Sequence, residues 1–167
     1  HTTEFEQNIG QFDAQVRYVA RSAGSMLFLT GDSAMYVLPF EDANVSKAES
    51  KPGRERTAQR FHAVSMAFAN ANTDIAASGD QISEHRTNYF LGSDESRWQS
   101  DVPNYGEIRF DNVYDGISAV WYGRENGATQ YDLIVAPKAD AQQIELRFDG
   151  DDSISIDDAG SLLINTP

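Results

Sequence analysis

Cysteine is absent from all 167 positions of the sequence. Its absence excludes disulfide bonds, thiol nucleophiles and zinc sites built on cysteine. Only three histidines are present, so the side chain that most often serves as a general base or metal ligand is scarce too. No run approaches the ~20 apolar residues that a membrane-spanning helix needs, and no signal peptide is visible. We therefore expect no membrane insertion, and we expect that any targeting segment has been removed.

Basic residues are also few. The chain has 13 Lys and Arg against 26 Asp and Glu, which gives a formal net charge of −13. Because nucleic acids and anionic membrane surfaces are bound through Lys and Arg, neither is an expected partner. Hydrophobic residues, in contrast, make up 40% of the chain, which is enough for one core in a chain of this length. We predict a single domain over residues 1–167.

Short motifs that mark enzymes are missing. The chain has no phosphate-binding glycine loop, no His-Glu-x-x-His and no serine nucleophile motif. The paired carboxylates of a glycoside hydrolase cannot be picked out among so many acids, so a hydrolase-type domain is the weakest alternative. We predict a non-catalytic domain that needs no cofactor.

The acidic run from Asp149 to Asp152 invites a calcium site, because hard cations take clustered carboxylate oxygens. Asp149, Asp151 and Asp152 are the weak candidates for such a site. The run lacks the spacing and distal glutamate of an EF-hand, and Asp and Gly are also ordinary turn residues. We interpret the run as a turn and predict no metal site.

Short alternating segments dominate the chain. Period-two patterns predict strands at residues 16–20, 26–30, 34–38, 61–68, 87–92, 107–111, 117–123, 129–135, 144–148, 154–156 and 162–164. Residues 39–59 and 70–86 are polar without a clear period, which indicates long loops. Ser93, Asp94 and Glu95 resemble the start of one short helical turn that Trp98 would pin to the domain. The predicted fold is an all-β antiparallel sandwich of about ten short strands with one short helical turn and long polar loops.

Two hairpins can be placed in register. Asn126-Gly127 suits a two-residue type I′ turn, which would put Tyr131 opposite Tyr122 and Asp132 opposite Trp121. In the last hairpin, a three-residue loop over 158–160 would put Leu162 opposite Ile156.

Aromatic side chains are the candidates for ligand binding. Trp121 beside Asp132 has the make-up of a carbohydrate platform, with a stacking face and a hydroxyl acceptor; Trp98 and Tyr105 are further candidates. The competing interpretation, which we favour, is that Trp121 is buried between layers and Trp98 packs on the domain. Exposed coplanar rings would favour carbohydrate binding.

The whole chain resembles a known family, and the likeness rests on a set of short motifs. They include Phe5-Glu6-x-Asn8-x-Gly10-Gln11-x-Asp13, Val16-Arg17-Tyr18-Val19-Ala20-Arg21, Asn88-Tyr89-Phe90-Leu91-Gly92, Val102-Pro103-x-Tyr105, Val113-Tyr114-x-Gly116-Ile117, Val135-Ala136-Pro137 and Ile144-x-Leu146-x-Phe148-x-Gly150. The family is a domain of unknown function near the N-terminus of large bacterial secreted and surface proteins that often carry SBBP-type β-propeller repeats.

The resemblance implies a setting rather than an activity. It implies export to the cell exterior and a module within a longer chain, with downstream domains as partners. We therefore expect a role in adhesion, recognition or domain assembly, with a glycan or a surface protein as a further partner. A carbohydrate-binding module is the alternative.

Overall fold

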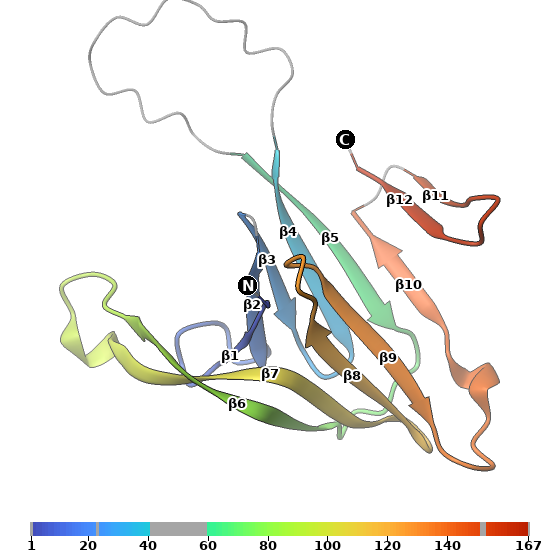
Figure 1. Ribbon diagram of the computed structural model, residues 1–167, viewed down its shortest axis with the longest axis horizontal. Coiled ribbons are helices and arrows are strands. Elements are labelled where there is room, and N and C mark those ends of the chain that lie inside the picture. The colour runs from blue at the N-terminus through green and yellow to red at the C-terminus, as the bar shows by residue number, and fades with distance from the viewer. Residues whose placement is uncertain (1, 23, 41–59, 151–152, 167) are drawn as a thin grey trace, which may run out of the picture.

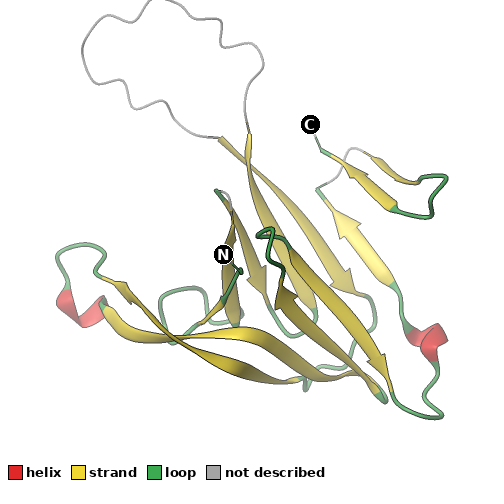
Figure 2. Ribbon diagram, in the orientation of Figure 1, coloured by secondary structure: helices red, strands yellow, loops and turns green. Residues whose placement is uncertain are grey.

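The computed structural model describes residues 2–22, 24–40, 60–150 and 153–166 (Figure 1). Most of the predicted loop over residues 39–59 therefore lies outside the described residues, as do Asp151 and Asp152. The described elements are β1 (Phe5–Gln7), β2 (Tyr18–Ser22), β3 (Ser25–Leu29), β4 (Ser33–Phe40), β5 (Arg60–Phe68), β6 (Ala76–Tyr89), the 3₁₀ turn η1 (Glu95–Arg97), β7 (Gln99–Tyr114), β8 (Ile117–Gly123), β9 (Thr129–Val135), the 3₁₀ turn η2 (Ala141–Gln143), β10 (Leu146–Asp149), β11 (Ser153–Ile156) and β12 (Leu162–Asn165). The predicted all-β class is confirmed (Figure 2).

The strands β1 to β10 form one antiparallel sheet. Its order is β10-β5-β4-β3-β2-β1-β7-β8-β9, and β6 pairs with the other edge of β7. The sheet curls so that its two halves face each other. Phe68 of β5 contacts Tyr114 of β7 and Tyr131 of β9 edge-on, at ring-centroid distances of 6.3 and 6.2 Å. The two layers expected of a sandwich are thus two halves of a single sheet, while β11 and β12 form a separate hairpin.

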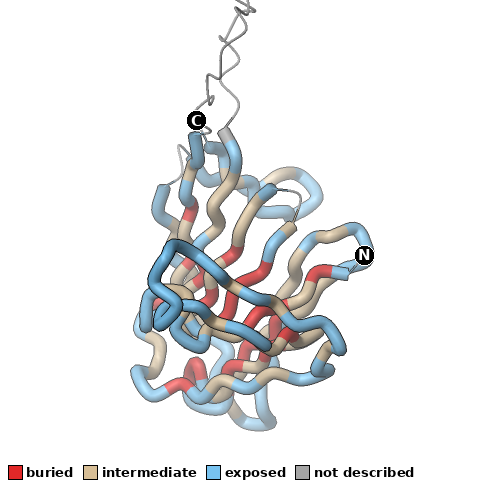
Figure 3. Tube along the Cα trace, turned by 90° about the vertical axis from the view of Figure 1, so that its left-hand side faces the viewer, coloured by how far each residue is buried: buried red, intermediate tan, exposed pale blue. Residues whose placement is uncertain are grey.

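The core lies inside this curl, where the buried residues, red in Figure 3, gather. Its largest fully buried side chains come from β1, β3, β7 and β8 and include Phe5, Leu29, Ile108, Phe110, Ile117 and Trp121. Strand β5 follows the predicted alternation, because Val64, Met66 and Phe68 are buried and the residues between them are not. His62, on the same face, meets the backbone oxygen of Gly150, as expected of a histidine at the edge of the core.

The prediction of a polar loop over residues 70–86 is wrong. Ala76–Tyr89 forms β6, which pairs with β7 along a 14-residue length. None of its residues is buried, so the strand has no apolar face to produce a period-two signal. Backbone hydrogen bonds to β7 hold it in place instead.

The register predicted for the β8–β9 hairpin is wrong by one residue. Trp121 pairs with Tyr131, and Asp132 pairs with Val120. The backbone N–H of Arg124 donates to Ala128 O at 2.8 Å, and Gly127 adopts a φ of 81°. The loop therefore has three residues, with Gly127 in the left-handed position. Since neighbouring strand residues point to opposite faces, the shift moves Asp132 away from Trp121. The last hairpin is confirmed: Ile156 pairs with Leu162.

Candidate functional site

The structure separates the residues that the sequence suggested for ligand stacking. Trp121 is 2% exposed, and its ring centroid lies 4.7 Å from that of Tyr131 inside the curl. The prediction that Trp121 is buried is confirmed. Asp132 lies exposed on the opposite face of the hairpin, so the proposed pair of Trp121 and Asp132 does not exist.

Tyr105 is half-buried rather than presented to solvent. Its ring packs edge-on against Tyr18 at 6.1 Å, and its hydroxyl donates to the side-chain oxygen of Gln7 at 3.3 Å. Gly79 of β6 lies directly over the ring, because a Cβ there would come within 2.4 Å of the Tyr105 ring carbons. A sugar therefore could not stack on that side of the ring.

Trp98 lies far from the core, at the end of the β6–β7 ribbon. Asp94, rather than Ser93, caps the turn η1 by accepting a 3.1 Å hydrogen bond from the backbone N–H of Ser96. The Trp98 ring packs edge-on against Phe90 at 5.4 Å, and its N–H donates to Gly92 O at 3.2 Å. The prediction that Trp98 pins the turn to the domain is therefore wrong, because its contacts stay within the ribbon.

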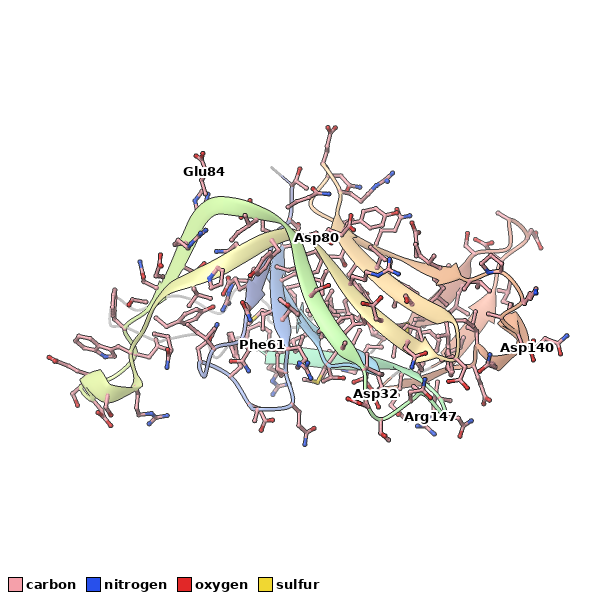
Figure 4. All side chains as sticks on the ribbon, turned by 90° about the horizontal axis from the view of Figure 1, so that it is seen from below. Asp32, Phe61, Asp80, Glu84, Asp140 and Arg147 are labelled. Carbon is pink, nitrogen blue, oxygen red and sulfur yellow. The ribbon has the colours of Figure 1, made fainter. Side chains whose placement is uncertain are left out.

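The end of this ribbon, residues 89–99, is called here the ribbon tip. It projects beyond the rest of the sheet in two perpendicular views (Figures 1 and 4). Phe90 is 59% exposed, Leu91 72% and Trp98 36%. A cleft of about 510 Å³ separates the tip from the loop after β1, and its lining includes Leu91, Arg97 and Gln99. The ribbon tip thus combines an apolar surface with a polar cleft.

The loop after β1, residues 8–17, supports the tip from the side. Asn8 organises this loop, because its side-chain amide donates to Asp13 O and Val16 O, both at 2.8 Å. Its side-chain oxygen accepts from the backbone of Gly10 at 3.0 Å and of Phe12 at 3.2 Å. The Phe12 ring in turn contacts Tyr89 of β6 at 5.7 Å.

A partly buried polar cluster joins β1, β2 and β6 at the base of the tip. It consists of Glu6, Arg21 and Tyr89. Glu6 is 8% exposed, and it accepts from the Arg21 Nε at 3.2 Å and from the Tyr89 hydroxyl through its other oxygen. Arg21 also donates to the Tyr89 hydroxyl at 2.9 Å. Both carboxylate oxygens are engaged within the chain, so this cluster serves structure. Sequence reasoning missed this cluster, and the signal for it was the place of Glu6, Arg21 and Tyr89 in the family motifs.

Partly buried tyrosines are expected to make the fold less stable at high pH. Burial raises the phenol pKa of Tyr18, Tyr36, Tyr89 and Tyr131 above the ordinary value of 10.0. A raised folded-state pKa contributes stability that is present below the unfolded pKa and lost as pH rises through the folded pKa. We expect melting temperatures that change little between about pH 7 and pH 9 and fall above about pH 10. Melting curves recorded with the phenolate absorbance would check this. Normal titration near pH 10 without a loss of stability would contradict it.

The outer face of β8 and β9 carries a second polar cluster. The hydroxyl of Tyr122 donates to Asp132 Oδ2 at 3.0 Å, and the amide of Gln130 donates to Asp132 Oδ1 at 3.4 Å. The aromatic partner of Asp132 is therefore Tyr122 rather than Trp121. A hollow of about 480 Å³ beside Tyr122 extends to the β8–β9 turn and is lined in part by Arg124 and Glu125.

Metal ligands do not gather in the described part of the chain, where no group of three or more His, Asp and Glu side chains is placed to hold an ion. Asp149 ends β10, and the other two calcium candidates lie outside the described residues. None of the described helices is long and apolar enough to cross a membrane.

Comparison with known proteins gives one match. Neither the curated proteins nor the solved structures contain a match to this chain. A family model does match, and it covers residues 5–167, which include the loop after β1, the ribbon and both hairpins. The chain therefore belongs to the family described as a domain of unknown function, DUF7948.

Proposed function

We propose that this chain is a non-catalytic recognition module of a bacterial secreted or cell-surface protein, and that its ribbon tip binds a protein partner. One observation carries the proposal: Phe90, Leu91 and Trp98 are exposed by 59%, 72% and 36% at the end of a projecting ribbon. Contiguous exposed apolar side chains mark interaction sites more often than chance, and aromatic residues are enriched in interface cores.

The tip also has the rigidity that a binding surface needs. The Trp98 N–H holds Gly92 O, and Asp94 caps the η1 turn, so the connection between β6 and β7 is fixed by its own hydrogen bonds. Below it, Phe12 and the cluster of Glu6, Arg21 and Tyr89 fasten the ribbon to the sheet. A surface ordered before binding loses less conformational entropy on association.

A protein partner fits the tip better than a glycan. The rings of Phe90 and Trp98 meet at an interplanar angle of 74°, so they do not form the coplanar row that sugar rings stack on. Leu91, the most exposed of the three side chains, has no ring. The partner is then either a downstream domain of the same polypeptide or another surface protein, which is the setting that the family resemblance supports.

Binding to intact cells of the producing bacterium would test this function. The labelled domain would be compared with a variant carrying Phe90→Ser, Leu91→Ser and Trp98→Ser. A matched control, Ile154→Ser with Ile156→Ser, removes exposed apolar side chains from β11 instead. We expect the tip variant to lose at least about tenfold in affinity, which corresponds to ~1.4 kcal/mol, while the control binds as wild type. Treating the cells with protease beforehand should remove the part of the binding that the tip variant lacks.

Two results would overturn the proposal. Unchanged retention of the tip variant would show that the ribbon tip is not the contact surface. Binding that depends on the tip side chains, survives protease treatment and is blocked by soluble sugars would replace the protein partner with a glycan.

A further inference from the structure

We propose a second binding site, for a neutral saccharide, on the outer face of β7, β8 and β9 with the ring of Tyr122 at its centre. This site lies away from the ribbon tip and does not depend on the function proposed for the tip. It assigns a ligand class to the hydrogen-bonded group of Tyr122, Gln130 and Asp132, which has no role in the core.

The strand register places this group on one surface. Glu107 of β7 pairs with Tyr122 of β8, which pairs with Gln130 of β9. Asp132 pairs with Val120, two residues along on the same side. All of these residues therefore share one face of the sheet, and Trp121 points to the other face, into the core. Asp80 of β6, labelled in Figure 4, extends the first row because it pairs with Glu107.

The Tyr122 side chain leans along the sheet. Its hydroxyl donates to Asp132, which is the diagonal neighbour rather than the residue directly opposite. Diagonal neighbours across antiparallel strands lie roughly 7–8 Å apart, a distance that a tyrosine spans only by leaning along the strands. Val120 lies on the same outer face, directly across from Asp132, and is only 7% exposed.

Hydrogen-bonding groups surround the ring. Asp132 accepts from Tyr122 and from Gln130, which fixes both side chains in place. Glu107 accepts from the amide of Gln81 at 3.4 Å. Partial desolvation, followed by donation to Asp132, raises the pKa of the Tyr122 phenol, so the hydroxyl remains a donor at neutral pH. Carboxylate and amide groups at the edge of an aromatic face match a pyranose, whose C–H face stacks while its hydroxyls donate and accept.

The charge of this face selects a neutral ligand. Three carboxylates, those of Glu107, Asp132 and Asp80, share the surface. The guanidinium of Arg109 is paired with Asp111 at 2.6 Å, and Arg124, at the turn beside Tyr122, is accompanied by Glu125. An anionic polysaccharide would be repelled by these carboxylates and by a chain of net charge −13.

Titration with soluble oligosaccharides tests the site. The probes would be hexasaccharides of β-1,4-linked glucose, xylose and mannose, with hexagalacturonate as the anionic comparison, and NMR chemical shifts would report binding. We expect at least one neutral hexasaccharide to bind the wild type and Tyr122→Ala to weaken it by at least about tenfold. Tyr122→Phe keeps the stacking face but loses the bond to Asp132, so it should bind two- to fivefold more weakly. The tip variant should bind as wild type.

Three results would overturn the site. Equal affinity of Tyr122→Ala and wild type would show that binding occurs elsewhere. Failure of all neutral hexasaccharides to bind would remove the ligand class, and a preference for hexagalacturonate would contradict the charge argument. A parallel melting curve of Tyr122→Ala, expected within a few degrees of wild type, separates loss of the site from loss of the fold. None of these results bears on the ribbon tip, which is tested on cells.

Discussion

Replacing Trp121 with alanine is expected to lower the free energy of unfolding by about 3–5 kcal/mol. The side chain is 2% exposed and packs on Tyr131 between the two halves of the curled sheet. Its removal leaves a cavity inside the curl, and the surrounding strands can fill such a cavity only in part. Total stabilities of domains are about 5–15 kcal/mol, so this one substitution should prevent folding or leave the protein marginal at room temperature.

Urea denaturation of the variant beside wild type measures the effect. Trp98→Ala is the control, because it also removes an indole but from the exposed ribbon tip, where the loss should stay below about 1.5 kcal/mol. A midpoint of Trp121→Ala close to that of wild type would mean that the ring does not hold the halves of the sheet together. If Trp121→Ala is insoluble, Trp121→Phe takes its place. It should fold with a smaller loss of stability, so that its urea midpoint can still be compared with that of wild type.

The sequence predicts the strands that have an apolar face. Val64, Met66 and Phe68 alternate and form the buried side of β5, and the last hairpin has the expected register because Gly160 adopts the left-handed conformation, with a φ of 83°. In β5 the signal is the burial of alternate residues, whereas in the last hairpin it is the turn chemistry, since every residue of β11 is exposed. These two signals are local, so a single sequence contains them.

The β8–β9 hairpin shows where local signals stop being sufficient. Asn-Gly suits a type I′ turn, in which both residues have positive φ, but Gly127 has a positive φ here and Asn126 does not. The two-residue type I′ turn and the three-residue loop seen here both accept Asn-Gly. Both faces of the hairpin are also rich in apolar residues. The pattern therefore does not distinguish registers that differ by one residue. It predicts Trp121 as the aromatic partner of Asp132, whereas the structure has Tyr122.

The ribbon could not be predicted for a different reason. Strand β6 has no buried residue. It is held by backbone pairing to β7, with partners such as Ala76 and Asp111, and such pairing leaves no mark in composition. Both candidate surfaces depend on such long-range pairing. Trp98 becomes a tip residue only because β6 and β7 extend beyond the sheet, and Glu6 meets Tyr89 across 83 positions of sequence.

Replacing Arg21 with methionine is expected to destabilise the domain by roughly 2–3 kcal/mol, which is less than or equal to the low end of the ~3–5 kcal/mol that breaking a buried ion pair costs. Glu6 is 8% exposed and would keep only the Tyr89 hydroxyl as a donor. The expected loss of stability is small because the Arg21 side chain is 44% exposed, so water already reaches the guanidinium.

A second variant identifies the cause. Arg21→Met combined with Glu6→Leu removes both charges, and it should recover most of the loss, because a buried ion pair replaced by apolar residues of similar volume is often no less stable. Equal damage in the single and the double variant would mean that Arg21 acts through packing against Phe12 and Tyr89, over whose rings its guanidinium lies at 6.0 and 5.9 Å. No damage in either would mean that the cluster does not hold the base of the ribbon. Urea midpoints of the wild type, the single variant and the double variant decide between these outcomes. Neither substitution changes the exposed apolar side chains of the ribbon tip.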